Sequence, residues 1–331
     1  MEQTIRWGLL GASRIARNKH IPATAEATGA EIVAIASRDQ AKADAWAAEF
    51  SIPTAYDSYD ALLADPAVDA VLITLPNSLH APWTIKAARA GKHILCEKPL
   101  ATTAQEARAM IAAADEAGVV LMEGFWIRFH PQLPFIRETI AAGTIGEIRL
   151  IRAELTYTIT DWGGDSRTRA DLGGGALFDA GCYCVHIIRH LVGAEPQAAT
   201  GFQRVHPDCG VDSTFTGLLD FDEGRMGYLA TSMEAPFRVC CEIIGTTGRI
   251  HTNSLFAAST VTIAAAGQPD RVETFEPGTG MRAQLEHVSS CIRDGTAPEI
   301  TAADSIGNAA TLEALKRAAE TGQAVGLPSR C

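Results

Sequence analysis

The chain has 331 residues, of which 47% are hydrophobic and 20% are charged, and its formal net charge at pH 7 is −11. This length exceeds the usual size of a single hydrophobic core, so we expect two domains. The acidic balance, without a cluster of Lys and Arg, disfavours nucleic acid and anionic membrane as partners.

The first ten residues, MEQTIRWGLL, contain no basic segment followed by an apolar one, so no secretory signal is expected. No stretch approaches the roughly 18 apolar residues that a membrane-spanning helix needs. Eight cysteines, at positions 96, 182, 184, 209, 240, 241, 291 and 331, include no Cys-x-x-Cys pair. We therefore expect reduced thiols in a cytoplasmic protein.

Short apolar runs alternate with Ala-rich amphipathic stretches up to about residue 124. The runs cover residues 5–10, 32–37, 68–74, 93–96 and 119–122, and the amphipathic stretches cover 40–49, 81–90 and 104–118. Strands that are buried on both faces and separated by helices are typical of a doubly wound parallel sheet. We expect an α/β Rossmann domain that binds a dinucleotide over residues 1–124.

The first run leads into GLLGASRIA, residues 8–16. Compared with the dinucleotide fingerprint G-x-G-x-x-G/A, this segment has Gly11, Ser13 and Ala16, so a serine replaces the middle glycine. The start of the following helix would bind the pyrophosphate, and the Ser13 hydroxyl can donate to a phosphate oxygen. An ordinary tight turn is the alternative. The loop residues expected at the coenzyme are Gly11, Ala12, Ser13, Arg14 and Ile15.

The second run ends in Ser37, Arg38 and Asp39. An NAD site has an Asp or Glu near this strand end to bind the ribose 2′-hydroxyl, whereas an arginine suits a 2′-phosphate. Ser37 and Arg38 occupy the first positions after the strand, so the sequence favours NADP over NAD. In the alternative, Arg38 is an ordinary surface charge and Asp39 reaches the ribose.

The fourth run belongs to HILCEKPL, residues 93–100, which places Glu97 and Lys98 at the carboxyl end of a buried strand. Pro99 keeps Lys98 away from helical angles. Ligands of open α/β sheets bind in the crevice beyond the carboxyl ends of the strands. Glu97 and Lys98 are therefore candidates for the site, although a strand-end ion pair needs no catalytic role.

After about residue 145, alternating apolar and polar side chains predict strands over 147–158, 198–205, 213–221, 226–232, 238–245 and 260–265. Helices are expected over 281–294 and 302–321. This pattern is typical of an open, mainly antiparallel sheet with one covered face. We expect a second domain, of α+β class, over residues 125–331, and association of two or more copies through its uncovered face.

The segment GGGALFDAGCYCVH, residues 173–186, has three glycines before a helix in which Asp179 and Tyr183 lie one turn apart, with His186 below them. This polar stripe is either a reaction site or a polar edge. Cys182, His186 and His190 follow a four-residue spacing, but no fourth ligand is evident and no metal is expected. The loop before the glycines holds Arg167 and Arg169, for which substrate contact and simple solvation both remain open.

Together, GLLGASRIA, LPNSLH, GKHILCEKPL, EGFWIRFHP and GGGALFDAGCYCVH resemble the glucose–fructose oxidoreductase/inositol dehydrogenase/MocA family over essentially the whole chain. The resemblance is strongest to the branch with dimeric dihydrodiol dehydrogenases and NADP-dependent D-xylose 1-dehydrogenases. Myo-inositol dehydrogenases have a histidine where this chain has Tyr183. The resemblance implies a homodimer or higher homo-oligomer and a catalytic group of Lys98, Asp179 and Tyr183. The further residues that it places at the coenzyme or substrate are Leu75, Pro76, Asn77, His80, Glu97, Trp126 and Arg128.

These residues suit the oxidation of an alcohol by NADP+, which requires a base for the hydroxyl proton. A free tyrosine has a pKa of about 10 and is a poor base at neutral pH, but a nearby ammonium such as that of Lys98 stabilises the phenolate. We expect an NADP-dependent dehydrogenase of a sugar or cyclic polyol, with D-xylose or D-glucose oxidised at C1. The alternatives are a trans-1,2-dihydrodiol dehydrogenase or carbonyl reductase and, in another class, a non-catalytic NADP-binding redox sensor.

Overall fold

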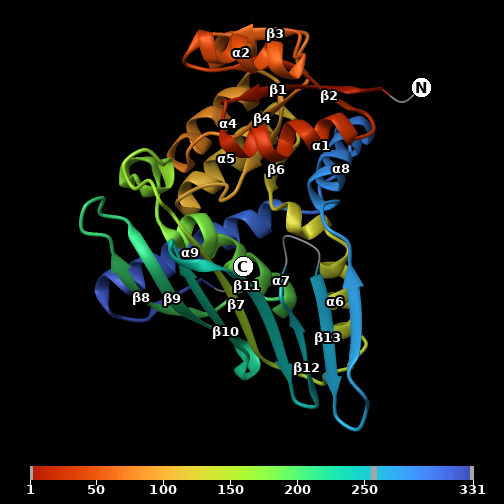
Figure 1. Ribbon diagram of the computed structural model, residues 1–331, viewed down its shortest axis with the longest axis vertical. Helices are drawn as coiled ribbons and strands as arrows, with labels where there is room; N and C mark the ends of the chain where they lie inside the picture. The colour runs from red at the N-terminus through yellow and green to blue at the C-terminus, as the bar shows by residue number, and fades with distance from the viewer. Residues whose placement is uncertain (1–2, 255–258, 329–331) are drawn as a thin grey trace. The chain divides into compact units, whose positions relative to one another are not determined.

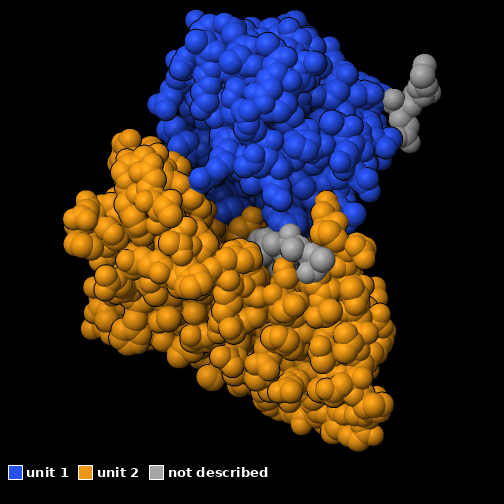
Figure 2. All heavy atoms as spheres, in the orientation of Figure 1, with its two compact units in different colours: residues 1–101, 105–129, 279–306 blue, residues 102–104, 130–278, 307–331 orange. Residues whose placement is uncertain are grey.

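A computed structural model of the chain describes residues 3–254 and 259–328, so the cysteine at position 331 lies outside the described residues. The chain divides into two compact units, coloured separately in Figure 2. Unit 1 comprises residues 1–101, 105–129 and 279–306, and unit 2 comprises residues 102–104, 130–278 and 307–331. Each unit is therefore assembled from several segments of the chain.

Unit 1 contains a parallel sheet whose strands follow the order β3-β2-β1-β4-β5-β6 in the described part of the chain. The crossovers run from β1 towards β3 in one direction and from β4 towards β6 in the other, which puts helices on both faces of the sheet. This arrangement confirms the doubly wound parallel sheet. The strands are β1 (Ile5–Leu10), β2 (Ala30–Ala36), β3 (Thr54–Tyr56), β4 (Ala70–Ile73), β5 (His93–Glu97) and β6 (Leu121–Gly124).

A late helix completes unit 1. Helix α8 (Gly280–Asp294) lies beside α1 and packs on β1 and β2 (Figure 1). Its Ser289 Oγ accepts a hydrogen bond of 3.3 Å from the indole N–H of Trp7, and both residues are fully buried. The predicted boundary between residues 124 and 125 stays a prediction. The other α-helices that lie wholly or mainly in unit 1 are α1 (Ile21–Glu26), α2 (Gln40–Phe50), α3 (Tyr59–Ala64), α4 (His80–Arg89) and α5 (Ala104–Ala117).

Unit 2 contains a larger sheet in the order β14-β13-β12-β11-β7-β10-β9-β8-β15, as far as the structure describes it. All neighbours are antiparallel except β7 and β10, which are parallel. The prediction of a mainly antiparallel α+β domain is confirmed. The strands are β7 (Ile148–Thr158), β8 (Ala198–Val205), β9 (Asp212–Asp220), β10 (Met226–Ser232), β11 (Glu234–Gly245), β12 (Gly248–Thr252), β13 (Ser259–Ala265), β14 (Arg271–Phe275) and β15 (Val325–Gly326).

Helices cover one face of the unit 2 sheet. A Cβ atom on Gly227 would lie 2.6 Å from Ile188 of α7 (Cys182–Val192), and one on Gly217 would lie 2.7 Å from Leu315 of α9 (Ala302–Thr321). These two glycines therefore allow the helices to approach the strands closely. Helix α6 (Gln132–Ala141) is the remaining α-helix described in this unit. Among the described helices, none has the length and apolar character needed to cross a bilayer.

Short helical segments join these elements. Two are π-helical, and they follow the glycine loop and the triple glycine, respectively; the others are 3₁₀ turns. The π-helical segments are η1 (Ala16–His20) and η6 (Leu177–Gly181), and the 3₁₀ turns are η2 (Asn77–Leu79), η3 (Trp126–Phe129), η4 (Ser166–Thr168), η5 (Ala170–Leu172) and η7 (Asp222–Gly224).

Candidate active site

The glycine loop after β1 turns sharply and leads directly into a capped helix. Gly11 has a φ of +102°, and a Cβ atom there would lie 2.8 Å from the Leu75 side chain. The Ser13 Oγ accepts a hydrogen bond of 3.2 Å from the backbone N–H of Ala16, so Ser13 caps the helix that follows. This bond uses the oxygen of the hydroxyl and not its proton. The serine in the middle glycine position therefore stabilises the helix start, and its O–H remains a suitable donor to a phosphate.

Arg38 and Asp39, the two candidates for contact with the ribose, follow β2 and have different partners. The Asp39 carboxylate accepts a hydrogen bond of 3.2 Å from the backbone N–H of Lys42 and caps α2. Burial raises the pKa of Tyr59, while the hydrogen-bonded Arg38 guanidinium opposes that rise, so Arg38 lies against the Tyr59 hydroxyl. Ser37 is buried, and its Oγ accepts the N–H of Asp39 at 3.2 Å. The only acid of this turn is therefore already bound to the start of a helix.

Glu97, at the end of β5, is buried and bound by a residue that the sequence did not single out. The ring Nε2 of His20 lies 2.6 Å from its Oε1. Burial by itself raises the pKa of Glu97, but the His20 hydrogen bond and the charges of His20 and Lys98 outweigh it and hold this pKa below its ordinary value. Lys98 follows directly, half-buried, and its backbone N–H donates to Glu97 Oε2 at 3.2 Å. Glu97 is thus a buried carboxylate directly beside Lys98. The only sequence signal for His20, its partner, is that it follows the glycine loop.

His80 joins two loops at the carboxyl edge of the sheet. It is fully buried, and its ring nitrogens lie 2.8 Å from the carbonyl oxygens of Leu75 and Pro99. Burial lowers the pKa of His80, although both carbonyl contacts oppose this. Its ring therefore links the loop after β4 to the loop after β5. Pro76 and Asn77 are half-buried at that edge, and contact between this group and a coenzyme stays a prediction.

Trp126 and Arg128 lie on η3 and are each 8% exposed. The Arg128 guanidinium donates to Glu299 at 2.9 Å and lies 3.9 Å from the carboxylate of Asp304. These carboxylates come from the segment that returns to unit 1 near the end of the chain. Arg128 therefore has a clear structural function in this unit, and its expected place beside the coenzyme or substrate stays a prediction.

The triple glycine in unit 2, residues 173–175, allows the Arg167 carbonyl and the Asp212 carboxylate to lie very close to its backbone. Gly173 and Gly175 have φ values of +73° and +118°. A Cβ atom on Gly174 would lie 2.4 Å from the carbonyl oxygen of Arg167, and one on Gly175 would lie 2.0 Å from Asp212 Oδ1. Asp212 accepts the Leu177 N–H at 2.7 Å at the start of η6. Burial raises the pKa of Asp212 to about 7, against the opposing effect of these backbone bonds. The glycines thus let Asp212 and the 165–172 loop reach the start of the helix.

Asp179 lies in η6 and Tyr183 in the first turn of α7. A π-helical turn is wider than an α-helical one, so the two residues are less strictly aligned than the expected α-helix predicts. Two contacts from unit 2 fall on the Asp179 carboxylate among its interactions: the Tyr157 hydroxyl donates to its Oδ2, and Arg167 Nη1 lies 3.7 Å from the same oxygen. The sequence left Arg167 open and did not single out Tyr157. Lys98 belongs to unit 1 and the other two candidates to unit 2, so the convergence of the three stays a prediction.

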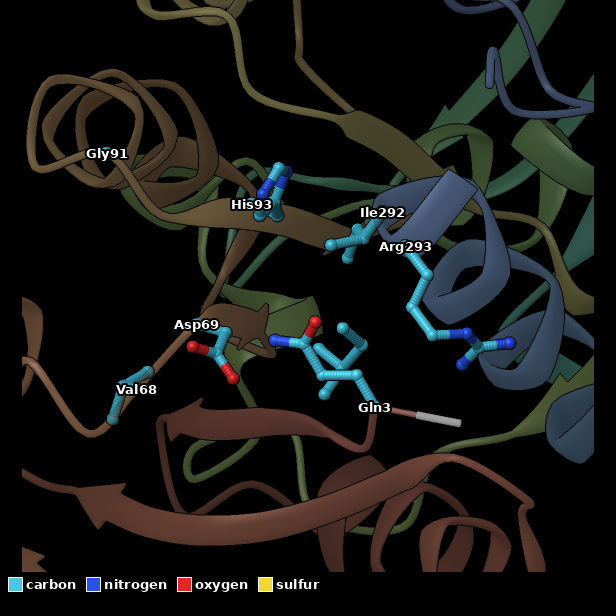
Figure 3. Close-up of a pocket in the computed structure, with 8 residues that line it drawn as sticks. Gln3, Val68, Asp69, Gly91, His93, Ile292 and Arg293 are labelled. Atoms are coloured by element: carbon cyan, nitrogen blue, oxygen red, sulfur yellow. The ribbon is translucent and has the colours of Figure 1, made fainter. Parts of the chain in front are cut away.

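A pocket of about 300 Å³ opens at the opposite edge of the unit 1 sheet. Gln3, Asp69, His93 and Arg293 line it, as Figure 3 shows. It lies at the amino ends of β1, β4 and β5, whereas ligands of doubly wound sheets bind beyond the carboxyl ends.

In residues 3–254 and 259–328, no three His, Cys, Asp or Glu side chains are arranged to hold a metal ion. The seven described cysteines are all free thiols.

Two family models match the chain in succession. Residues 5–125 match an oxidoreductase family with an NAD-binding Rossmann fold, and residues 135–251 match the GFO/IDH/MocA C-terminal domain. A D-xylose 1-dehydrogenase (NADP(+)) of Haloferax volcanii is 38% identical over 326 residues, which cover 97% of this chain and 99% of the relative. The chain belongs to the GFO/IDH/MocA oxidoreductase family. This membership confirms the resemblance inferred from the motifs.

Two further members of the GFO/IDH/MocA family show the range of activities near this chain. A trans-1,2-dihydrobenzene-1,2-diol dehydrogenase of Mus musculus is 32% identical, with 95% of this chain and 96% of the relative covered. A crystal structure of a 3-ketoreductase from Actinomadura kijaniata with NADP and TDP-benzene superposes with a TM-score of 0.90 at 31% identity, covering 96% and 98% of the two chains. The family resemblance thus extends over both units.

Proposed function

We propose that the chain is an NADP-dependent dehydrogenase that transfers a hydride between the nicotinamide and a sugar or cyclic polyol, with an aldose such as D-xylose or D-glucose oxidised at C1. The observation that carries the proposal is the combination of a Rossmann glycine loop in unit 1 with Asp179 and Tyr183 at the start of a buried helix in unit 2. The 38% identity to a D-xylose 1-dehydrogenase (NADP(+)) supports the aldose as substrate.

The residues of unit 1 fit NADP. Gly11 admits a close backbone approach, Ser13 orders the helix start, and Arg38 offers a guanidinium where a 2′-phosphate would lie. Asp39, the alternative at this position, caps α2 through its Oδ1. The residues that we assign to the coenzyme are those of the glycine loop, Ser37 and Arg38, the 75–80 loop, Glu97, Lys98, Trp126 and Arg128.

Bound NADP+ supplies the acceptor for the hydride. In our assignment the substrate hydroxyl loses its proton to Tyr183, and Asp179 orients the reacting groups. Lys98 supplies the ammonium that stabilises the tyrosine in its ionised form. The His20 hydrogen bond and the Lys98 charge lower the pKa of the buried Glu97, so a carboxylate lies next to Lys98. The acid and base functions thus rest on protein side chains.

A substrate screen that follows NADPH absorbance tests this function. Purified protein is mixed with NADP+ or NAD+ and with a panel of aldoses, inositols and trans-dihydrodiols, and reduction of ketones by NADPH is followed in parallel. We expect turnover of at least one pyranose aldose with NADP+. Preferred turnover of a trans-dihydrodiol supports the second candidate, for which the 32% identity to a dihydrodiol dehydrogenase speaks. Tight NADP binding without turnover of any compound indicates a redox sensor.

Replacing Arg38 with Ala tests the coenzyme assignment. The variant loses the charge-assisted hydrogen bonds to the 2′-phosphate, which contribute about 1.5–3 kcal/mol. We expect kcat/KM for NADP+ to fall about 10- to 100-fold while kcat/KM for NAD+ changes little. Lys42→Ala removes a neighbouring positive charge without touching the ribose position and serves as the control. A wild-type protein that prefers NAD+ contradicts the assignment.

We propose that two copies associate through the uncovered face of the unit 2 sheet. Phe202 lies opposite Thr216 and Tyr228 opposite Leu218 in the strand register, so these side chains share that face. Phe202 is 76% and Leu218 45% exposed, which is unusual for side chains of their size. The exposed apolar patch of Phe202 and Leu218 on this face, beside the charged Arg152, suits a symmetric contact. The free thiols of the described cysteines support our proposal that the protein acts in the cytoplasm.

Leu218→Glu tests the association, because it puts a charge on each of the two copies in the contact. We expect the dimer dissociation constant to rise at least about tenfold, as a desolvated charge costs well over 1.4 kcal/mol. Light scattering after size-exclusion chromatography at micromolar concentration measures the mass. Ala45→Glu, on an exposed position of α2, adds the same charge elsewhere and is expected to leave the mass unchanged. A monomeric wild-type protein refutes the proposal.

A further inference from the structure

Asp179 is bound from outside its own helix. Tyr157, on β7, donates its hydroxyl to Asp179 Oδ2, and Arg167 Nη1 lies 3.7 Å from the same oxygen. The Arg167 guanidinium also lies over the Tyr157 ring, 5.0 Å from its centroid. Because both contacts fall on one oxygen, they fix the rotation of the carboxylate group as well as its position. The three residues belong to unit 2.

The loop that carries Arg167 is itself fastened to the helix start. The backbone N–H of Gly175 donates to the Arg167 carbonyl at 2.9 Å, and that of Gly174 donates to the Arg169 carbonyl at 2.9 Å. A Cβ atom on Gly174 would lie 2.4 Å from the Arg167 carbonyl oxygen, so only a glycine allows this approach. The triple glycine therefore fixes the position of the Arg167 backbone, from which the side chain extends.

The Arg167 charge is largely balanced by another acid. Its guanidinium donates to Asp165 at 2.9 Å from Nε and 2.6 Å from Nη2. Burial opposes the charge of Arg167, but Asp165 and the charge of Asp179 outweigh it and raise the pKa of Arg167, so it stays a cation. With its charge shared between two carboxylates, Arg167 contributes less to Asp179 than the direct hydrogen bond does. Tyr157 is therefore the stronger contact, and Arg167 holds its ring in place.

We propose that Tyr157 is a positioning residue, which acts through Asp179 by fixing the orientation of its carboxylate, with Arg167 locking the Tyr157 ring. The proposal rests on the proposed function, in which Asp179 orients the reacting groups next to Tyr183. Tyr157 itself exchanges no proton with the substrate in this arrangement. With Tyr157 and Arg167, the proposed site residues of unit 2 come from the helix, from strand β7 and from the loop over residues 165–172.

Tyr157→Phe keeps the ring and its contact with Arg167 and removes only the hydroxyl. We expect kcat to fall about 10- to 100-fold, while KM for NADP+ and for the sugar stay within about twofold. Tyr56→Phe is the matched control, because Tyr56 also donates to a carboxylate, that of Asp65 at 2.9 Å, in unit 1. It is expected to leave kcat within about twofold. An unchanged kcat in Tyr157→Phe overturns the proposal.

A double-mutant cycle separates action through Asp179 from a general effect on folding. In an Asp179→Ala background, adding Tyr157→Phe is expected to change the residual kcat by less than about threefold. The same 10- to 100-fold loss in both backgrounds means that Tyr157 acts independently of Asp179, which contradicts the proposal. Thermal unfolding of all variants reports any loss of fold.

Crystal structures of the variants test the orientation of the Asp179 carboxylate directly, without a measurement of activity. In Tyr157→Phe we expect the Asp179 carboxylate to rotate or to occupy two conformers, and in Tyr56→Phe to keep its orientation. An unchanged single orientation in Tyr157→Phe refutes the proposal, whatever the enzyme does. Conversely, a wild-type protein that turns over no sugar, polyol or diol refutes the proposed function, and the rotation of Asp179 in Tyr157→Phe still decides whether Tyr157 positions it.

Discussion

Tyr183→Phe is expected to lower kcat about 10²- to 10⁴-fold, which is the usual contribution of a general acid or base. The variant keeps the ring of a side chain that is only 8% exposed, so the helix packing is preserved. Because the hydroxyl is assigned to the chemistry and not to coenzyme binding, the Kd for NADP+ should stay the same. Steady-state kinetics with the best sugar of the substrate screen, together with fluorescence titration of NADPH, measures both quantities.

Tyr56→Phe provides the comparison for this experiment, since it removes a tyrosine hydroxyl that donates to Asp65 in unit 1. Its kcat should equal that of the wild type. Retention of more than about a tenth of the wild-type kcat in Tyr183→Phe contradicts the role of Tyr183 as the base. A loss of NADP+ binding instead indicates a place for this residue in the coenzyme site.

Gly175→Ala is expected to destabilise the protein by about 3 kcal/mol. A side chain at a φ of +118° is strained by about 1–3 kcal/mol, and the added Cβ would lie 2.0 Å from Asp212 Oδ1. Asp212 is half-buried and bonded to the Leu177 N–H, so it cannot move aside without uncapping the helix, at a cost of about 1 kcal/mol. Urea unfolding monitored by circular dichroism measures the loss, and kcat should fall with it because Asp179 follows on the same helix.

Gly193→Ala is the matched control for this substitution. Gly193 ends α7 with a φ of +73°, and nothing lies within 4 Å of its added Cβ. Only backbone strain remains, so we expect a loss of about 1 kcal/mol and an unchanged kcat. Equal losses in the two variants mean that the contact with Asp212 carries no stability.

The sequence analysis located many of the longer elements but missed helix α6 and strands β12 and β14. The sequence predicted helix 302–321 and strands 198–205 and 226–232 with the bounds of α9, β8 and β10. Strand β3 has three half-buried residues, and β15 has two, which is too short for a periodic signal. The π-helical turn at Leu177–Gly181 also escaped prediction, because its hydrogen bonds depend on the surrounding structure and not on residue propensity.

The site could be predicted only where a motif names its residues. The glycine loop and the glycine-rich stretch before Asp179 have such patterns, and family resemblance supplied the rest. His20 and Tyr157 have no such pattern, because their contacts with Glu97 and with Asp179 are long-range and no neighbouring residue indicates them. Asp212 was likewise invisible, since its partner at the helix start is 35 residues away. Pairings of this kind follow from topology.

The return of α8 to unit 1 has a consequence for biosynthesis. The indole of Trp7, in the first strand of the chain, finds its hydrogen-bond partner at Ser289, 282 positions later. While the ribosome is still translating the intervening sequence, the strands of unit 1 can pair. The surface around Trp7 that α8 later covers remains exposed to water. The unit 1 segments before residue 130 therefore complete their packing only after α8 has been synthesised.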